Sequence, residues 1–509
     1  MINLVICALI TATDAGRILA VFPTPSISHQ VVFRPLTEEL AKRGHEVIVI
    51  TPDPAFTEEN LPANLIEIDV HNISYEAWRK EFFRLNIGDG NYLLSQSSVA
   101  FKLFAKVFEA QMKEKEVQKV LDTGGRFDLL LLEACVRPTL ALSHIFKSPV
   151  IQVSSFGPMF GTNEIAGVTI HPIFYPSVIS QRIFNLTIWE KIREFYYYYK
   201  IEKLYKSFEP EENELIRKFF GPEIPPLSKL YDNIDMFFLN IDPIWANNQP
   251  IPSNIVYIGG IHQKPGKELP KDLQTYLNSS KYDVIYVSFG TNVHSSQVPL
   301  HIVESMVETF GQLKYSILWK WDDDKIKVSE NVKIYKWLPQ MDLLRHPKVK
   351  LFITQGGLQS TQEAILAGVP LIGVPSLGDQ WHNTEKYVYH KIGLKLAMNS
   401  LTAKSFKEAI LTIIEDESYR NNIVKLRNII HDQPQTPLER AIWWMEHVLR
   451  HGGAKHLRAS AANKSWAEYY ELKLLGILLM GFILACFIVR HVWIYVLKIL
   501  SWRIKFKNA

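Results

Sequence analysis

The sequence has little cysteine, little excess charge and no internal repeat. It contains three cysteines in 509 residues, of which Cys7 and Cys486 lie in apolar segments near the two ends. Cys135 then has no partner in the main part of the chain, which excludes an internal disulfide. The formal net charge of +4 is too small to indicate a basic surface for nucleic acid. No cluster of residues with metal-ligand spacing stands out, so we expect no metal in the chemistry.

The length and the order of the apolar segments predict two α/β domains. A chain of 509 residues is too long for one compact core. Short apolar runs that read as buried strands alternate with turn residues and helical patterns, which is typical of a parallel sheet covered by helices. The strands that we expect in the first half are 17–22, 47–50, 129–132 and 150–153, and those in the second half are 284–289, 317–321, 351–354 and 371–374.

The first fifteen residues predict a cleaved signal peptide. A short apolar run at 4–10 precedes Thr13, Asp14 and Ala15, which suit cleavage near Ala15. The segment before the run lacks Lys and Arg. An alternative is that these residues form the first buried strand, but residues 18–22 already fit that strand.

The C-terminal region predicts a transmembrane helix over residues 474–497, after a juxtamembrane segment at 457–473. Residues 474–489 carry no charge, and the apolar pattern resumes after Arg490 and His491. Roughly 20 apolar residues span a bilayer, so the segment qualifies if Arg490 lies near the cytosolic face.

The tail at 498–509 is basic and contains no acidic residue, which places it in the cytosol and the bulk of the protein in the lumen as a type I membrane protein. Lys505 and Lys507 stand fifth and third from the end, the arrangement of a dilysine retrieval signal for the endoplasmic reticulum. Four glycosylation sequons fit a lumenal chain, and they begin at Asn72, Asn185, Asn278 and Asn463.

A glycine turn in the second half indicates a phosphate site. Gln355, Gly356 and Gly357 follow the strand expected at 351–354 and open a helix that contains Glu363. Glycines at such a turn let backbone N–H groups approach a phosphate at the helix N-terminus. The carboxylate two helical turns later suits a ribose hydroxyl.

Residues 337–380, which contain this turn, resemble the donor signature of the UDP-glycosyltransferase family. The stretch opens on Trp337-Leu338-Pro339-Gln340 and closes on Gly378-Asp379-Gln380. Further matches at 258–262, 287–291 and 450–458 extend the resemblance over nearly the whole chain. Gln355 stands where vertebrate members usually have His, and this variation looks like the arthropod branch of the family.

The resemblance implies a GT-B fold, in which two Rossmann-like domains face one another across a cleft. We expect an acceptor-binding domain at 16–260, a linker at 261–280 and a donor-binding domain at 281–456. The family also implies a UDP-sugar co-substrate, with no bound cofactor. Its donor-site roles fall on Trp337 and Gln340 for uracil, Ser288, Gln355, Gly356 and Gly357 for the diphosphate, Glu363 for ribose, and Asp379 and Gln380 for the sugar.

The resemblance places the catalytic base in the loop after the first strand, where Ser28 and His29 stand. Neutral imidazole suits the removal of a proton from a hydroxyl acceptor. The family's second catalytic residue is an Asp that orients this histidine, and Glu133 aligns with it. The longer side chain changes the reach, so Asp128 remains the alternative.

The donor sugar is predicted from one position at which this sequence differs from glucuronate-using members of the family. An Arg that the resemblance associates with glucuronate-using members aligns with Gln249, and a neutral amide suits a neutral sugar better than a carboxylate. We therefore expect an inverting transfer of glucose from UDP-glucose to a hydroxyl of a small lipophilic acceptor, as in detoxification. UDP-glucuronate is the alternative donor.

Two other functions and two other properties stay open. A non-catalytic, membrane-tethered binder of lipophilic molecules and a sugar-nucleotide epimerase are the rival interpretations. The sequence identifies neither the acceptor nor the oligomeric state, a homo-oligomer included. The aromatic stretch at 173–208 fits an acceptor pocket, a membrane surface or ordinary helix packing.

Overall fold

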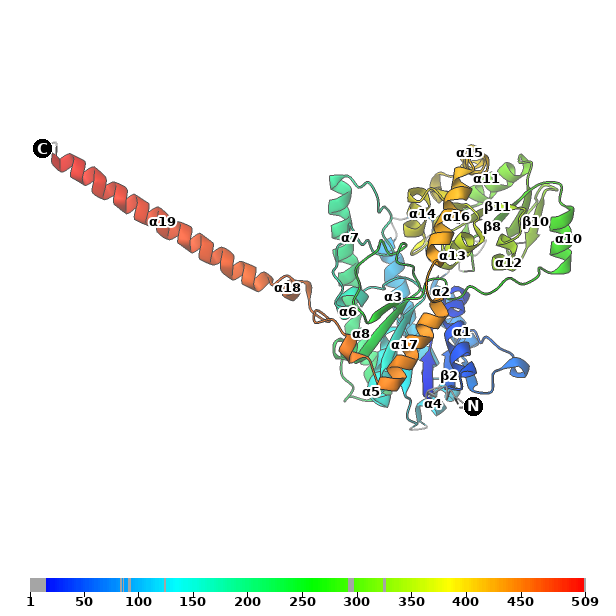
Figure 1. Ribbon diagram of the computed structural model, residues 1–509, viewed down its shortest axis with the longest axis horizontal. Coiled ribbons are helices and arrows are strands. Elements are labelled where there is room, and N and C mark those ends of the chain that lie inside the picture. The colour runs from blue at the N-terminus through cyan, green and yellow to red at the C-terminus, as the bar shows by residue number, and fades with distance from the viewer. Residues whose placement is uncertain are drawn as a thin grey trace, which may run out of the picture.

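The protein is described by a computed structural model of residues 15–507, except 83–84, 86, 90–92, 123–124, 292–296 and 324–325. Residues 1–14 of the predicted signal peptide and the last two residues of the tail lie outside the described residues. Two α/β domains sit against each other, and one long helix projects away from them (Figure 1).

The first domain is built on a seven-stranded parallel sheet in the order β3-β2-β1-β4-β5-β6-β7. The side chains of β1 alternate between the two faces of this sheet, so Ile18 and Ala20 belong to one apolar cluster and Leu19 and Val21 to another. Burial on both faces is what a parallel sheet covered by helices requires. The strands are β1 (Arg17–Val21), β2 (Glu46–Thr51), β3 (Leu65–Asp69), β4 (Leu129–Glu133), β5 (Val150–Ser154), β6 (Ile234–Leu239) and β7 (Ile255–Tyr257).

The second domain repeats this plan with a six-stranded parallel sheet in the order β10-β9-β8-β11-β12-β13. All eight strands that the sequence predicted are present, each with its bounds shifted by no more than two residues at either end. The strands of this sheet are β8 (Val284–Ser288), β9 (Ser316–Lys320), β10 (Val332–Tyr335), β11 (Val349–Thr354), β12 (Leu371–Gly373) and β13 (Gly393–Lys395).

Helices cover both sheets. Those before residue 240 are α1 (Ile27–Lys42), α2 (His71–Phe82), α3 (Leu93–Gln111), α4 (Lys115–Asp122), α5 (Ala141–Phe146), α6 (Thr162–Ala166), α7 (Ile188–Ser207), α8 (Glu209–Phe220) and α9 (Leu227–Leu230). Those after it are α10 (Lys271–Ser279), α11 (Leu300–Gly311), α12 (Gln340–Leu344), α13 (Leu358–Ala367), α14 (Gln380–Tyr389), α15 (Ala403–Glu415), α16 (Ser418–His431), α17 (Pro437–His451), α18 (Trp466–Tyr469) and α19 (Leu472–Lys507).

The strand order reverses once in each sheet, between β1 and β4 and between β8 and β11. In an open parallel sheet, the carboxyl ends of the strands at such a reversal form a crevice where ligands bind. Glu133 ends β4 and Ser288 ends β8. The topology alone therefore directs attention to the residues that follow these four strands.

Helix α17 departs from the expected domain boundaries. The sequence assigned residues 281–456 to the second domain, but Ala441, Ile442, Met445 and Val448 of α17 are buried in the cluster that covers the first sheet. The helix lies along the first domain in Figure 1. The chain thus returns to the first domain because this helix has an apolar side that completes the core there.

The connection between the domains is also shorter than the expected linker at 261–280. Helix α10 (Lys271–Ser279) occupies the second half of that range, and its Leu273 and Leu277 are buried. Lys333 of β10 lies over the ring of Tyr276, 3.8 Å from its centroid, so α10 belongs to the second domain.

The long helix α19 contains the predicted span. Residues Leu472–Arg503 form a stretch that is long and apolar enough to cross a membrane, and none of its most apolar window is buried against the rest of the protein. Such exposure of apolar side chains on all sides of a helix is typical of a membrane span.

Candidate active site

His29 lies in the first turn of α1, directly after the loop that follows β1. Its Nδ1 atom is 2.9 Å from Oε1 of Glu133, and both side chains are buried. The ring packs edge-on against Phe156, with 4.9 Å between the ring centroids. Because Nδ1 is engaged by the carboxylate, Nε2 is the ring nitrogen that can accept a proton from a ligand.

Glu133 is held in place by a second hydrogen bond. Its Oε2 atom accepts from the backbone N–H of Thr24, at 2.9 Å, in the loop that leads to α1. Asp128, the alternative partner, instead accepts from the backbone N–H of Arg17 at the exposed start of β1, at 2.8 Å. The structure therefore places Glu133, and not Asp128, against His29.

The same pair forms, with Cys135, a group that could hold a metal ion. One ligand atom from each of His29, Glu133 and Cys135 lies within 4.8 Å of the others. Burial raises the pKa of the Cys135 thiol well above its ordinary value. The thiolate, which is the form that ligates a metal, is therefore disfavoured here unless a metal itself displaces the proton.

A cavity of about 340 Å³ separates the start of α1 from the second domain. Its wall on the first domain consists of Ile27, Ser28, Val31 and Phe156. The cavity collects every donor-site residue that the sequence predicted except Gly356, namely Ser288, Trp337, Gln340, Gln355, Gly357, Glu363, Asp379 and Gln380. We call it the donor cavity.

At one end of the donor cavity, the ring of Trp337 is 63% exposed and free to stack on a flat ligand. Beside it, Gln340 donates from Nε2 to Oε2 of Glu363 at 2.8 Å and to the hydroxyl of Ser360 at 3.0 Å. The hydroxyl of Tyr286 donates to Oε1 of Gln340 at 3.1 Å. The polar groups at this end therefore satisfy one another.

The glycine turn follows β11 as predicted. Gly356 has φ +91°, and a Cβ there would come within 2.6 Å of Thr384 Cγ2, so only glycine fits without strain. Gly357 is the N-cap of α13, whose first N–H groups point toward the turn. A Cβ added to Gly290 would lie only 2.2 Å from Nε2 of Gln355. Gly290 therefore makes room for Gln355.

Asp379 and Gln380 stand at the start of α14. Asp379 accepts from Asn383 Nδ2 at 2.7 Å, and burial raises the pKa of its carboxyl to about 6, while the proximity of His29 acts in the opposite direction. Gln380 Oε1 accepts from the backbone and hydroxyl of Ser376 and from Leu377 N–H. Its amide nitrogen is then the group that it can offer to a ligand.

Lys320 is a site residue that the sequence reading missed. It ends β9 and lines the donor cavity, where its Nζ atom donates to the carbonyl of Gly290 at 2.7 Å. Burial lowers the pKa of its ammonium group. The signal was its position at the carboxyl end of a strand that neighbours β8, the same edge that carries Ser288.

Gln249 does not lie in the donor cavity. The expectation that its neutral amide selects glucose is therefore not supported by its position. It is buried beside a different cavity, lined by Met159, Phe160 and Tyr175 among others. Its amide nitrogen donates to the carbonyl of Thr169 at 3.2 Å. The fold directs its side chain to a structural contact within the first domain.

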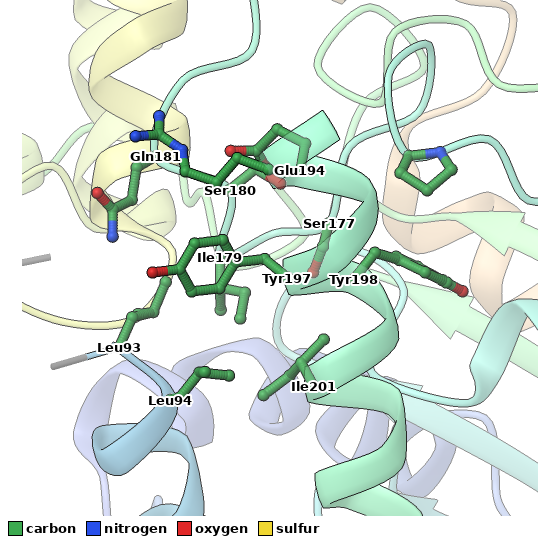
Figure 2. Close-up of a pocket in the computed structure, with 12 residues that line it drawn as sticks. Leu93, Leu94, Ser177, Ile179, Ser180, Gln181, Glu194, Tyr197, Tyr198 and Ile201 are labelled. Carbon is green, nitrogen blue, oxygen red and sulfur yellow. The ribbon is translucent and has the colours of Figure 1, made fainter. Parts of the chain in front are cut away.

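A second cavity, of about 60 Å³, lies beside α7 in the aromatic stretch (Figure 2). Tyr197, Tyr198 and Ile201 of α7 line it, and Glu194 lies one turn earlier on the helix, beside Ser180. Burial raises the pKa of Glu194. Helix α7 thus supplies a pocket from one face, while its other face exposes large apolar side chains, among them Ile188, Trp189, Ile192, Phe195, Tyr196 and Tyr199.

The cavity of Figure 2 adjoins the second domain through the loop at 177–181. The carbonyl of Ser177 lies 3.1 Å from Nδ1 of His382 in α14, and the carbonyl of Gln181 accepts from Lys395 Nζ at 3.0 Å. This loop therefore connects the wall of the pocket to the helix that begins at Asp379 and Gln380.

Three of the four sequon asparagines are exposed, namely Asn72, Asn185 and Asn278. Asn463 is half-buried, and its amide nitrogen donates to Oδ1 of Asp232 at 2.5 Å. Attachment of a glycan to Asn463 would compete with this bond, whereas the other three sites are accessible.

The sequence profile of the family described as UDP-glucoronosyl and UDP-glucosyl transferase matches residues 16–505. An ecdysteroid UDP-glucosyltransferase of Spodoptera littoralis nuclear polyhedrosis virus is 36% identical over 92% of this chain and 95% of its own length. UDP-glucuronosyltransferase 2B1 of Rattus norvegicus is 28% identical over 93% of this chain and 92% of its own.

Among solved structures, the glycotransferase of kitacinnamycin is similar with a TM-score of 0.58 and 18% identity, over 85% of this chain and 98% of that one. This likeness confirms the predicted GT-B fold. Together with the profile match and the curated relatives, it shows that this chain is a UDP-glycosyltransferase and belongs to the family of UDP-glucuronosyl and UDP-glucosyl transferases.

Proposed function

We propose that the protein transfers glucose from UDP-glucose to a hydroxyl group of a small lipophilic acceptor, with inversion at the anomeric carbon. The observation that carries this proposal is the buried contact of His29 Nδ1 with Glu133, 2.9 Å long, beside the donor cavity. A base at the mouth of a donor site is the arrangement that direct displacement requires.

In this mechanism, His29 Nε2 takes the proton of the acceptor hydroxyl while the oxygen attacks the anomeric carbon. The bond between that carbon and the UDP oxygen breaks, and UDP leaves with the electron pair. Glu133 accepts the Nδ1–H bond throughout and stabilises the imidazolium that forms. Since one displacement moves the sugar, the configuration inverts.

On the donor side, we assign uracil to Trp337 and the ribose to Glu363. The diphosphate would meet Ser288, Lys320 and the N-terminus of α13, which together provide a hydroxyl, a cation and backbone N–H groups. Asp379 and the amide nitrogen of Gln380 would bond the sugar hydroxyls.

Glucose is the proposed donor sugar because the viral relative at 36% identity is named a UDP-glucosyltransferase. The rat relative at 28% identity is named a UDP-glucuronosyltransferase, so UDP-glucuronate is the second candidate. With Gln249 outside the donor cavity, the choice rests on this similarity and no longer on that residue.

The acceptor class is proposed from the named relative and from the cavity of Figure 2. Tyrosine rings and aliphatic side chains line this cavity together with Gln181, Arg193 and Glu194, so at about 60 Å³ it suits one end of an apolar molecule that carries a polar group. The viral relative is named for ecdysteroids, which places steroid-like alcohols first among acceptors to be assayed. A role in detoxification is a prediction of the same kind.

We further propose that α19 anchors the enzyme in the endoplasmic reticulum membrane with both domains in the lumen. The support is the apolar stretch Leu472–Arg503 together with the predicted signal peptide and dilysine tail. Removal of glycans by a glycosidase, combined with protease protection of microsomes, tests the orientation. Protection of the tail instead of the domains would overturn it.

The function is tested by measuring UDP release from UDP-glucose and UDP-glucuronate by the detergent-solubilised chain, with a panel of phenols and steroid alcohols. We expect release with UDP-glucose to exceed that with UDP-glucuronate by at least about tenfold. The product should be a β-glucoside, since UDP-glucose is an α-glycoside. Binding of acceptors without any UDP release would instead favour the non-catalytic binder.

A further inference from the structure

Three histidines gather at the C-terminal end of α17, in a region that the transferase mechanism does not use. His447 and His451 are one helical turn apart on α17, and His456 lies in the short helical turn at Lys455–Leu457. None of the three lines the donor cavity or the cavity of Figure 2. They belong to the stretch around 450–458 for which the mechanism gives no role.

Two of the three rings are in direct contact, and the third lies beside them. The Nε2 atoms of His447 and His456 are 3.3 Å apart. The ring centroid of His451 is 4.5 Å from that of His447 and 6.3 Å from that of His456. His447 is half-buried, whereas the other two side chains are exposed.

The backbone fixes this arrangement. Gly452 and Gly453 have φ values of +62° and +134°, which end α17 and turn the chain back toward it. After the turn, the N–H of Ala454 donates to Oδ1 of Asp235 at 2.7 Å, and Lys455 Nζ lies 3.5 Å from Oδ2 of the same carboxylate. His456 is therefore held against α17 by a buried anchor and does not depend on a flexible loop.

From this geometry we propose that His447, His451 and His456 form a binding site for a divalent transition metal of the zinc class. Tetrahedral coordination with Zn–N bonds of about 2.0–2.1 Å sets neighbouring ligand nitrogens roughly 3.3–3.4 Å apart. The Nε2 atoms of His447 and His456 already have this separation. Two histidines four residues apart on a helix are a common metal-binding pair.

His451 completes the site by rotation of its side chain. Its ring is exposed at the end of the helix, so a change of rotamer can bring a ring nitrogen toward the other two. Water supplies the fourth ligand, as in sites with three protein imidazoles. The exposed position leaves this metal accessible to solvent and to exchange.

The charged neighbours of the site are already paired. Arg450 lies over the ring of Trp443 and 3.8 Å from Glu446, and Glu446 also pairs with Arg43. Lys455 is directed to Asp235. The cations next to the histidines are thus partly neutralised, which reduces their repulsion of a metal ion.

A metal at this site would tie α17 to the segment that leads to the apolar helix α19. Helix α17 completes the core of the first domain, and after His456 the chain continues along that domain, where Asn463 bonds Asp232, before it reaches α18 and α19 (Figure 1). The site would therefore fasten α17 to the start of the segment that leads to the membrane anchor.

The test is a titration of the full chain in detergent with Zn²⁺, after removal of any polyhistidine tag and of bound metal by a chelator. We expect one ion per chain at this site, and a Co²⁺ derivative with the intense visible bands of tetrahedral coordination. The double variant H447A/H456A should weaken Zn²⁺ binding by at least about tenfold and lose these bands. H301A, which removes an exposed histidine of α11, is the matched control and should bind as the wild type does.

Equal Zn²⁺ affinity in wild type and H447A/H456A would overturn the proposal, because the close Nε2 contact would then be a plain hydrogen bond between neutral rings. H456Q guards against misfolding, since glutamine keeps a polar side chain of similar length. A folded H456Q protein with undiminished Zn²⁺ binding would also overturn it. The measurement uses no sugar nucleotide, so its outcome is independent of the proposed transferase function.

Discussion

The two sides of the cleft differ in how closely their functional side chains are packed and bonded before a ligand binds. On the first domain, His29 and Glu133 are buried in direct contact, and the N–H of Thr24 fixes the carboxylate from the other side. On the second domain, Trp337 at one end of the donor cavity is 63% exposed, and the polar side chains beside it bond one another.

This difference shows which side of the cleft must exchange hydrogen bonds when a ligand binds. Gln340 and Glu363 bond each other in the donor cavity, as do Asp379 and Asn383. A ligand that enters must exchange these bonds for its own, which costs little net free energy when each bond is replaced. The catalytic pair needs no such exchange, so we expect its variants to affect turnover and donor-cavity variants to affect donor affinity.

His29→Ala should give the largest effect. Loss of a positioned general base lowers kcat by about 10²- to 10⁴-fold. The KM for UDP-glucose should change little, because His29 does not line the donor cavity. Steady-state kinetics of UDP release with varied donor measures both constants. An unchanged kcat would contradict the proposed mechanism.

Glu133→Gln should lower kcat by roughly 10-fold to 10³-fold, less than His29→Ala, because the amide can still bond Nδ1 but cannot stabilise an imidazolium. Asp128→Asn is the matched control, since Asp128 bonds Arg17 N–H and not the histidine. Glu133→Asp measures whether the longer side chain is required. If Asp128→Asn lowered kcat as much as Glu133→Gln, the assignment of the pair would be wrong.

The catalytic pair, His29 and Glu133, was harder to derive from the sequence than the donor cavity. The donor residues lie within one continuous stretch, 337–380, with Ser288 apart, and glycines after a strand carry their own physical signal. His29 and Glu133 are more than 100 residues apart, and only the neighbouring strands β1 and β4 bring them together. No local pattern decides between Glu133 and Asp128.

Other features depended on packing that spacing cannot reveal. The alternation of strands and helices predicted both sheets, because buried parallel strands are continuous apolar runs. The amphipathic pattern of α17 did not say which domain its apolar side would cover. Likewise, the position of Gln249 in the chain did not predict that its amide would turn to Thr169 and away from the donor.

Gly290→Ala tests whether the position of Gln355 in the donor cavity matters for donor binding. A Cβ at this position would come within 2.2 Å of Gln355 Nε2 and would hold φ at +74°. We expect the KM for UDP-glucose to rise about tenfold as Gln355 is displaced, with a smaller change in kcat. Gly44→Ala imposes a similar positive φ, +94°, with nothing within 4 Å, and so separates the strain from the clash. Equal donor KM values in the two variants would show that Gln355 does not matter for the donor.

The smallest expected effect, and the sharpest test of the comparison, is the pH dependence of donor binding. Burial raises the pKa of Asp379 to about 6. If the carboxylate accepts sugar hydroxyls, binding favours the ionised form, so affinity is full above pH 6 and weakens as the pH falls through that value. The loss cannot exceed about tenfold per pH unit for one group.

Direct binding of UDP-glucose to the His29→Ala variant, between about pH 8 and pH 5, follows this titration without the histidine, because the diphosphate of UDP-glucose is esterified at both ends. Since the proximity of His29 lowers the pKa of Asp379, the midpoint in this variant should lie higher than in the wild type. Asp379→Asn in the same background should bind more weakly at the upper pH and show a flat profile. A flat profile in the presence of Asp379 would mean that the sugar does not bond this carboxylate. The donor cavity would then differ from the catalytic pair in exposure alone, because the carboxyl group of Asp379, with its pKa near 6, would take no part in binding.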